Sequence, residues 1–429
     1  MLIFQTRSQE QHDKTYLVAE LNSFLQKPRN TKFVPEYQYK TFFFNSPNIE
    51  KSEIMEITAE HVMDVRAEQY KIAGEILRAS KMTNVVFYTE NSKVAQSLAS
   101  DLVDAAAKKI KSTPANELEM QLGRYILSGR IKFVPGSESV SADWWAQDLG
   151  EPTGAFVSSG GKSKPEYITS LTGNLYGWGH AVPMKSDASV VQIPACLAGG
   201  NFTKTICKEK RLCIVGANDV IETSNLYSSY GLKITLREVT DIYKKAFGSD
   251  DVLVLGKENG PIGSWKLQPH QMPHIDQAVF FPKEGVAVIV SPPKEMEKER
   301  AAVNGYKTQL IDAGFEIIEI PTTKERIEKY QAYTNSITIS PTSLRTSSFS
   351  YKDGPEGESM STILIMPSFD YKDGLEERIR SILEEHGFKV IFVPDKAFKH
   401  RGNTHCITGA LSYNDMVPQF YKQAMEKDC

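Results

Sequence analysis

The feature that most constrains the fold is a repeated unit in which an amphipathic helix leads through glycine into a short apolar strand that ends at proline. In the clearest copy, apolar residues at helical spacing run from Leu375 to Leu383, Gly387 follows, and a strand over 388–393 precedes Pro394. Apolar side chains at this spacing predict one buried helix face, and the glycine is typical of a helix end. Because helices and strands alternate, the unit predicts an α/β architecture.

The same order of elements recurs elsewhere in the chain. Two further clear copies and two weaker ones have their strands over 315–320, 131–134, 252–255 and 190–193. A unit repeated about five times, with a longer period than solenoid repeats, predicts pseudo-symmetric modules around a centre. By length alone, the 429 residues would suggest two or three domains of roughly 100–200 residues each.

Other segments fill the spaces between these units. Strands are expected over 41–44, 84–88, 212–215, 278–281, 286–290 and 362–366, and helices over 60–79, 94–110, 117–127, 236–247 and 297–312. Two stretches, 153–184 and 341–361, are rich in Gly, Ser or Pro, and we expect them to be loops. A long loop in a compact domain can also cover a binding site, which is a second interpretation of both stretches.

The composition excludes several classes of protein. The 50 Lys and Arg residues nearly balance 53 Asp and Glu residues, so the net charge of −3 gives no field that would hold nucleic acid or an anionic membrane. The longest apolar stretch, 286–290, is far shorter than the roughly 18 residues of a membrane helix. The N-terminal residues lack an apolar secretory segment, so we expect a cytoplasmic protein.

Polar segments follow the strands of the repeated unit and contain the candidate functional residues. They are 144–148, 199–201, 274–276, 333–335 and 402–406. In pseudo-symmetric modules, equivalent loops converge on one rim, which is where α/β folds place their sites. We therefore expect the thiol of Cys406, the imidazole of His274 and the carboxylates of Asp148 and Asp276 to meet.

This set of side chains suits one kind of chemistry. A thiolate is a strong nucleophile, and a histidine can pass protons to a leaving group and take them from water. Two carboxylates are unnecessary for an ordinary ester or amide, but they match the several N–H donors of a planar guanidinium. The sequence therefore predicts guanidine chemistry.

Several residues have simpler structural interpretations. Cys196, Cys207 and Cys213 lie in or near apolar strands, so we expect small buried side chains there. His270 and His274 have the spacing of a helical zinc pair, but the prolines at 269 and 273 disfavour a helix. The five cysteines include no CxxC pair, so neither a disulfide framework nor a zinc ribbon is expected, and a metal site at the two histidines is only a minority interpretation.

Four short motifs resemble those of the pentein superfamily, which contains agmatine deiminases, arginine deiminases and protein-arginine deiminases. They are G-N-T-H-C-I-T at 402–408, H-I-D at 274–276, W-A-Q-D at 145–148 and Y-T-N at 333–335. The first is similar to the nucleophile motif of agmatine deiminases. Each motif is weak alone, but together, in this order and spacing, they are specific.

The resemblance implies a propeller of five ββαβ modules with pseudo-fivefold symmetry and one central site. Residues 37–429 would form this single catalytic domain, and residues 1–36 an N-terminal helical extension. The resemblance also implies roles for Asp148 and Asp276 in holding the guanidinium, for Cys406 as nucleophile, and for His274 as acid and base. Neither a metal nor another cofactor is expected. Substrate-binding roles are implied for Trp145, Gln147, Gly200, Asn201, Asn335, Asn403 and His405.

We therefore expect a guanidine deiminase that converts an arginine-type guanidinium into a ureido group and ammonia through a thiouronium on Cys406. Peptidyl or protein arginine is placed ahead of agmatine and free arginine. Gln147 matches animal protein-arginine deiminases, two loops look long for a small-molecule enzyme, and Ala198 stands where agmatine deiminases usually have an acidic residue. Amidino transfer and a non-catalytic binding module are the alternatives, and the sequence predicts no oligomeric state.

Overall fold

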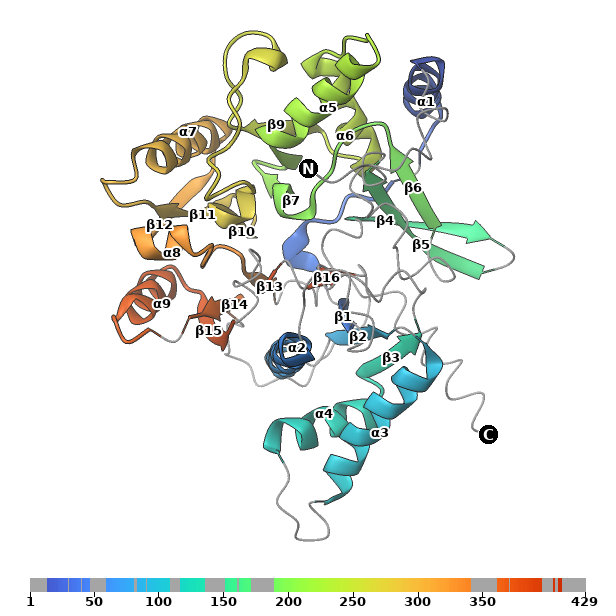
Figure 1. Cartoon of the computed structure of the whole chain (residues 1–429), viewed down its shortest axis with the longest axis vertical. Coiled ribbons are helices and arrows are strands. Elements are labelled where there is room, and N and C mark those ends of the chain that lie inside the picture. Colours follow the sequence, from blue (N-terminus) through green and yellow to red (C-terminus); the bar gives the residue numbers. More distant parts are fainter. Residues whose placement is uncertain are drawn as a thin grey trace.

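Helices and strands alternate through the described chain, which confirms the predicted α/β architecture. The computed structural model describes residues 14–29, 31–39, 41–46, 59–80, 83–89, 91–108, 116–135, 151–159, 162–170, 189–340, 361–369, 371–395, 404–405 and 408–410. Figure 1 shows small sheets around a central region, with helices on the outside. Within these ranges, none of the helices has the length and apolar character needed to cross a membrane.

The described strands form five small sheets. Their orders are β16-β1-β2-β3, β4-β5-β6, β7-β8-β9, β10-β11-β12 and β13-β14-β15. The strands are β1 (Thr41–Ser46), β2 (Asn84–Thr89), β3 (Ile131–Pro135), β4 (Glu151–Ser159), β5 (Lys162–Ser170), β6 (Ser189–Ile193), β7 (Phe202–Cys207), β8 (Lys210–Gly216), β9 (Asp251–Leu255), β10 (Val279–Lys283), β11 (Val286–Ser291), β12 (Glu316–Pro321), β13 (Ile337–Ile339), β14 (Ile363–Ser368), β15 (Lys389–Pro394) and β16 (Gly409–Ala410).

The five sheets share one pairing pattern. The first strand runs antiparallel to the second, as where Ile337 of β13 pairs with Ile365 of β14, and the second runs parallel to the third. In the sheet that contains β1, the antiparallel strand is β16, with Ala410 opposite Phe42, and β1, β2 and β3 are parallel. The first and the last of the described strands therefore pair in one sheet.

Helices connect most of the parallel strands, because parallel pairing requires a crossover of a dozen or more residues. They are α2 (Ala59–Ala79), α3 (Ser92–Lys108), α4 (Glu117–Leu127), α5 (Ala217–Ser229), α6 (Leu236–Phe247), α7 (Glu297–Ala313) and α9 (Leu375–Glu385). The other described helices are α1 (Lys14–Gln26), α8 (Lys324–Glu328) and the 3-10 turns η1 (Glu36–Gln38), η7 (Gly199–Asn201), η8 (Ile262–Ser264) and η9 (Ile275–Gln277).

Glycines with left-handed backbone geometry separate four helices from the strands that follow them. The φ angle is 74° at Gly129, 66° at Gly248, 98° at Gly314 and 83° at Gly387. Glycine adopts this region without the steric cost that a Cβ imposes, so it allows the chain to leave the helix sharply. These positions explain why the helix ends could be read from the sequence.

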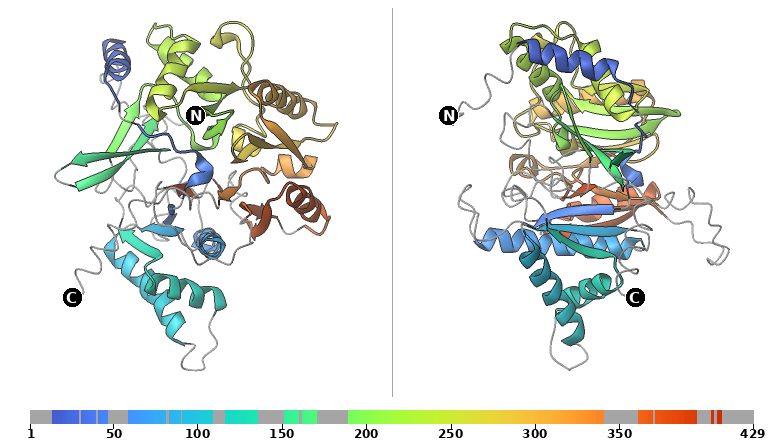
Figure 2. Two further views of the ribbon diagram at one scale, coloured as in Figure 1. Left: turned by 180° about the vertical axis from the view of Figure 1, so that it is seen from behind. Right: turned by 90° about the vertical axis from the view of Figure 1, so that its right-hand side faces the viewer.

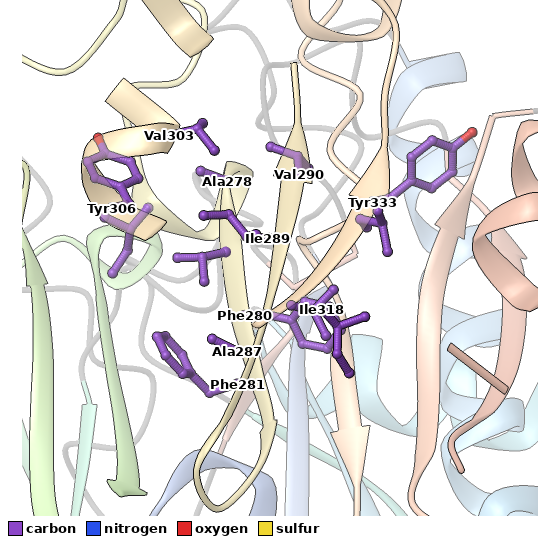
Figure 3. Packing of buried hydrophobic residues seen from close by; sticks show 14 of the residues in the cluster. Ala278, Phe280, Phe281, Ala287, Ile289, Val290, Val303, Tyr306, Ile318 and Tyr333 are labelled. Atoms are coloured by element: carbon purple, nitrogen blue, oxygen red, sulfur yellow. The ribbon is translucent and has the colours of Figure 1, made fainter. Parts of the chain in front are cut away.

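The sheet that carries two candidate site residues is fixed by buried packing. Figure 3 shows Ile289 of β11 close to Val303 and Tyr306 of α7, which belong to one buried cluster. Full burial of one such apolar side chain contributes roughly 1.5–3 kcal/mol. This packing holds β10, and the loop immediately before β10 contains His274 and Asp276.

The expectation of a loop over 153–184 is wrong for its first part. Strands β4 and β5 form an antiparallel pair there, and Tyr167 and Ile168 are fully buried. The glycines and polar residues concealed the strands, because their burial depends on neighbours that are distant in sequence. The rest of this stretch, 171–184, and most of the second expected loop, 341–360, lie outside the described residues.

Strand β7 was also missed. Its residues Thr203, Lys204 and Thr205 are polar, yet all three are buried. Thr203 contacts the partly buried carboxylate of Glu36, and Lys204 contacts the buried carboxylate of Glu151. The sequence of β7 therefore lacks an apolar pattern, because polar partners as well as apolar packing hold this strand.

The segment before β1 enters the centre of the molecule. Helix α1 packs against α6 on the outside, where Phe24 is buried. The chain then turns inward, and η1 contacts β7, β10 and β13. This turn is the short blue piece near the middle of Figures 1 and 2. Glu36, the last residue of the expected N-terminal extension, therefore lies at the centre.

Candidate active site

The candidate residues meet because they occupy equivalent positions in different sheets. Asn201 precedes β7, Asp276 precedes β10, Asn335 precedes β13 and His405 precedes β16, each by only a few residues. Strands β7, β10 and β13 line one central pocket, with Asp276 and His405 also in its wall. In the sequence, Asp148 stands in the same relation to β4.

The loop before β10 is held by its neighbours. Asn218, at the start of α5, donates from Nδ2 to the carbonyl of Pro273 at 3.0 Å. The backbone N–H of Ile275, which lies between His274 and Asp276, donates to Oδ1 of Asn201 at 3.2 Å. Both contacts restrict the direction in which the imidazole and the carboxylate leave the backbone.

Gly200 lies directly against these two side chains. A Cβ at this position would lie 2.5 Å from Nδ1 of His274 and 3.0 Å from Oδ2 of Asp276. Separations this short would force the imidazole or the carboxylate to move. The structure therefore brings Gly200 to the candidate acid–base pair and explains why a side chain is absent there.

Asn335 joins two of the converging loops. Its Nδ2 donates to Oδ2 of Asp276 at 2.6 Å, and its Oδ1 accepts from the backbone N–H of His405 at 2.8 Å. Nδ1 of His405 lies 3.5 Å from the same Oδ2 of Asp276. All three residues thus form one connected polar group at the wall of the pocket.

Sequence reasoning missed Glu36, which completes this group. Its Oε1 lies 3.6 Å from Nε2 of His405, and its Oε2 accepts a hydrogen bond from the hydroxyl of Thr203. A single Glu before a Tyr carries no recognisable signal, and only the inward path of η1 brings it here. We call Glu36, Asp276, Asn335 and His405 the imidazole cluster.

Two carboxylates, on opposite sides of its ring, favour the charged form of His405. Burial alone would lower the pKa of His405, but its contacts with Asp276 and Glu36 outweigh burial and raise that pKa to about 10. Burial also disfavours charge on Glu36, yet His405, Thr203 and Lys204 together lower its pKa. The partly buried pair of Glu36 and His405 therefore retains its charges at neutral pH.

A second buried carboxylate, Asp219, stands behind Asn201 in the first turn of α5. Its Oδ1 accepts from Nδ2 of Asn201 at 2.8 Å, and its Oδ2 accepts from the backbone N–H of Ala198 at 2.9 Å. Burial raises the pKa of Asp219 to about 7 despite these hydrogen bonds. We call Ala198, Asn201 and Asp219 the anchor cluster, because it positions the loop that holds Gly200.

The central pocket is mostly apolar beside the imidazole cluster. Tyr39, Phe202 and Phe280 contribute to its walls, and Glu36 and Glu151 are among its acidic residues. Apolar surroundings strengthen the interaction between charges because they exclude water. The charges of the imidazole cluster therefore act more strongly on each other than they would at the surface.

Five of the predicted site residues lie outside the described residues. These are Trp145, Gln147, Asp148, Asn403 and Cys406. Cys406 follows His405 directly in the chain. The structure thus describes six of the eleven predicted residues. Asp276, Asn335 and His405 belong to the imidazole cluster, and Asn201 belongs to the anchor cluster. Gly200 and His274 come from two different loops and lie against each other between the clusters.

The other described thiols match their structural interpretation. Cys196, Cys207 and Cys213 are buried, and burial raises the pKa of Cys213 to about 12. Residues 269–274 do not form a helix, so the two histidines there lack the geometry of a helical zinc pair. In the part of the chain that the structure describes, no group of three or more His, Cys, Asp or Glu side chains could hold a metal ion.

Comparison with known proteins gives a result for the structure only. No family model matches the sequence, and the search of curated proteins gives no match. A substrate-bound serine variant of agmatine deiminase from C. jejuni has a TM-score of 0.56 to this structure, at 16% identity, over 88% of this chain and 95% of that chain. Agmatine deiminase of Enterococcus faecalis has a TM-score of 0.53 at 12% identity, with 89% and 95% covered.

At these identities the likeness establishes the fold. The chain is folded like the agmatine deiminases of known structure over nearly their whole length. The resemblance drawn from the four short motifs is confirmed at that level.

Proposed function

We propose that this chain, which has the fold of the agmatine deiminases, is a guanidine deiminase. It hydrolyses a C–N bond of an arginine-type guanidinium and forms a ureido group and ammonia. The observation that supports this most is the convergence of His274, Asp276, Asn335 and His405 from three loops. The carboxylate of Asp276, for the guanidinium, lies beside His405, which precedes Cys406 in the chain. The imidazole of His274, for proton transfer, lies with that carboxylate against Gly200.

The reaction has two steps. Asp276 and Asp148 accept the N–H groups of the guanidinium, and the thiolate of Cys406 attacks its central carbon. His274 gives a proton to the departing ammonia, which leaves a thiouronium on Cys406. His274 then takes a proton from water, the water oxygen bonds to the thiouronium carbon, and the C–S bond breaks to restore the thiolate. The net reaction consumes one water and releases one ammonia.

This chemistry belongs to a propeller of five ββαβ modules around a pseudo-fivefold axis. Support comes from the pairing pattern that the five described sheets share and from the pairing of β16 with β1. Residues 37–429 form its single catalytic domain, and residues 1–36 are an extension whose last residue contacts His405. One domain therefore contains one site.

Agmatine is the first substrate to test, and peptidyl arginine is the second. Agmatine is the substrate class of the solved structures with the same fold. The argument for peptidyl arginine now depends on Gln147, on Ala198 and on one expected loop, because β4 and β5 occupy much of the other expected loop. Free arginine is the third candidate.

The test is an assay of ureido product and ammonia with agmatine, arginine and an N-acyl arginine amide. We expect turnover of at least one, and loss of that turnover in Cys406→Ser, since the hydroxyl is a far weaker nucleophile than a thiolate. The matched control is Cys207→Ser, because the Cys207 thiol is buried against the carbonyl of Ala313, away from the cluster.

Two results would contradict the proposal. The first is undiminished product formation by Cys406→Ser. The second is no ureido product from any of the three guanidines by a folded wild-type protein.

A further inference from the structure

Glu36 has a feature that packing does not explain. The segment that carries it is already held by buried apolar residues, among them Val34, Tyr37 and Tyr39. A carboxylate placed in such surroundings is costly unless a cation or several donors compensate it. Its charge therefore has a specific partner.

That partner is His405. Lys204 is the other nearby cation, but its Nζ donates to the carbonyl of Pro152 and lies 3.9 Å from Oε2 of Glu151. Glu36 instead lies 3.6 Å from Nε2 of His405 on the side of the ring opposite Asp276. Each buried cation is thus paired with a different glutamate.

We propose that Glu36 is a positioning residue, which fixes the ring of His405 and keeps it cationic; His405 directly precedes Cys406, the proposed nucleophile, in the chain. The N-terminal segment that brings η1 into the centre is then part of the site. For catalysis this inference rests on the proposed deiminase function; for the ionisation of His405 it does not. A neighbouring cation lowers the pKa of a thiol and so raises the thiolate fraction.

The charged groups around His405 act in one direction. Asp276 from η9 and Glu36 from η1 both stabilise the imidazolium. Lys204 of β7 lowers the pKa of Glu36, which keeps that carboxylate charged, while Glu151 of β4 partly balances Lys204. Of the two carboxylates that contact His405 directly, Glu36 is the one that can be removed without touching Asp276, the proposed guanidinium ligand.

The decisive experiment compares full-length Glu36→Gln with wild type by two measurements that need no turnover. The first is the titration of His405 by NMR on protein with ¹³C-labelled histidine, with the signal assigned by its loss in His405→Asn. The second is the pH dependence of iodoacetamide alkylation of the Cys406 peptide, quantified by mass spectrometry. Glutamine keeps the size of the side chain and an acceptor for Thr203, so only the charge is lost.

We expect the titration midpoint of His405 to fall by about 1–3 units in Glu36→Gln, the range that one adjacent opposite charge produces. The alkylation midpoint of Cys406 should rise, because the imidazolium of the preceding residue in the chain is lost at a lower pH. The control is Glu166→Gln. It removes a buried carboxylate that pairs with Arg29 at 2.6 Å, outside the imidazole cluster, and should move neither midpoint.

If Glu36→Gln does not fold, Thr203→Val takes its place, because it removes only the hydroxyl that donates to Glu36. It should shift both midpoints in the same directions by less. Unchanged midpoints in the folded variant, or equal shifts in Glu166→Gln, would overturn the proposal. If both midpoints shift but no guanidine is hydrolysed, the positioning role stands and the proposed function fails.

Discussion

The imidazole cluster and the anchor cluster each bury a carboxylate, but only the first places a cation against it. Glu36 faces His405, and its pKa is lowered despite burial. Asp219 receives its hydrogen bonds from neutral donors, the Asn201 side chain and the Ala198 backbone, and burial raises its pKa to about 7. The cations near Glu36, together with the hydroxyl of Thr203, therefore outweigh the effect of burial, whereas the neutral donors to Asp219 do not.

This difference in pKa indicates that the two clusters have different roles. A buried ion pair is weak support for stability, because hydrophobic side chains of similar size often serve as well. Retaining charges in the imidazole cluster is thus best explained by chemistry on a cationic substrate. The anchor cluster needs only fixed hydrogen-bond geometry, and an acid that is partly neutral near pH 7 provides it.

The largest expected effect comes from removing a carboxylate of the imidazole cluster, and the same change in the anchor cluster is its comparison. Asp276→Asn should lower kcat/KM on the order of 1,000-fold, since breaking one side of a buried charge pair costs about 3–5 kcal/mol. Asp219→Asn should lower it less than about 10-fold, because the remaining side-chain oxygen can still accept one of the two hydrogen bonds that Asp219 receives. Steady-state kinetics on the best guanidine measures both.

The comparison between the clusters fails if the two variants lose activity equally. Circular dichroism of both proteins is the control for folding. A large loss in Asp219→Asn alone would mean that the anchor cluster, and not the imidazole cluster, carries the charge that matters.

A smaller effect is expected where the two clusters meet. Gly200→Ala should lower kcat about 100-fold, the cost of a misplacement of about 1 Å in a catalytic group, because its Cβ would displace His274 or Asp276. Gly263→Ala is the matched control, since nothing lies within 4 Å of a Cβ there.

The two glycine variants are compared by kcat and by thermal melting. Gly263→Ala should keep both near wild type. A Gly200→Ala enzyme with wild-type kcat would show that the imidazole and the carboxylate can move without consequence, which contradicts a fixed site.

Most of the regular fold could be predicted because its signals are local. Gly314 and Gly387 follow amphipathic helices and mark their ends, and the structure has a positive φ at both. Strand β7 could not be predicted in this way, because buried Thr203 and Lys204 interrupt its apolar pattern. Their partners, Glu36 and the β4 segment, are distant in the sequence.

The candidate site likewise contains residues that the sequence predicts and one that it does not. His274, Asp276, Asn335 and His405 stand in short motifs, and loops before equivalent strands bring them together. Glu36 could not be predicted, because its contact with His405 links the two ends of the chain and depends on the inward path of the segment before β1. Motifs therefore identify residues that converge in the structure but not the charges that surround them.

The smallest expected effect is on stability, and it distinguishes the clusters by pH. The pKa of Asp219 is raised from 3.8 to about 7 on folding, so the folded state binds more protons than the unfolded state between these values, and stability falls as the pH rises through this window. The pKa of His405 is raised from 6.5 to about 10, so its contribution is complete below pH 6.5 and is lost as the pH rises toward 10. The two windows barely overlap.

Urea unfolding of wild type and Asp219→Asn at several pH values makes this separation measurable. The asparagine cannot ionise, so the free energy of unfolding of the variant relative to wild type should rise by about 3 kcal/mol between pH 4.5 and 7.5, given about 1.4 kcal/mol per pKa unit. Above pH 7.5 the difference should stay constant, because the remaining loss belongs to His405 and affects both proteins. If the difference instead grew between pH 7.5 and 10, the loss of stability at high pH would belong to Asp219. The distinction between the charged imidazole cluster and the anchor cluster would then be wrong.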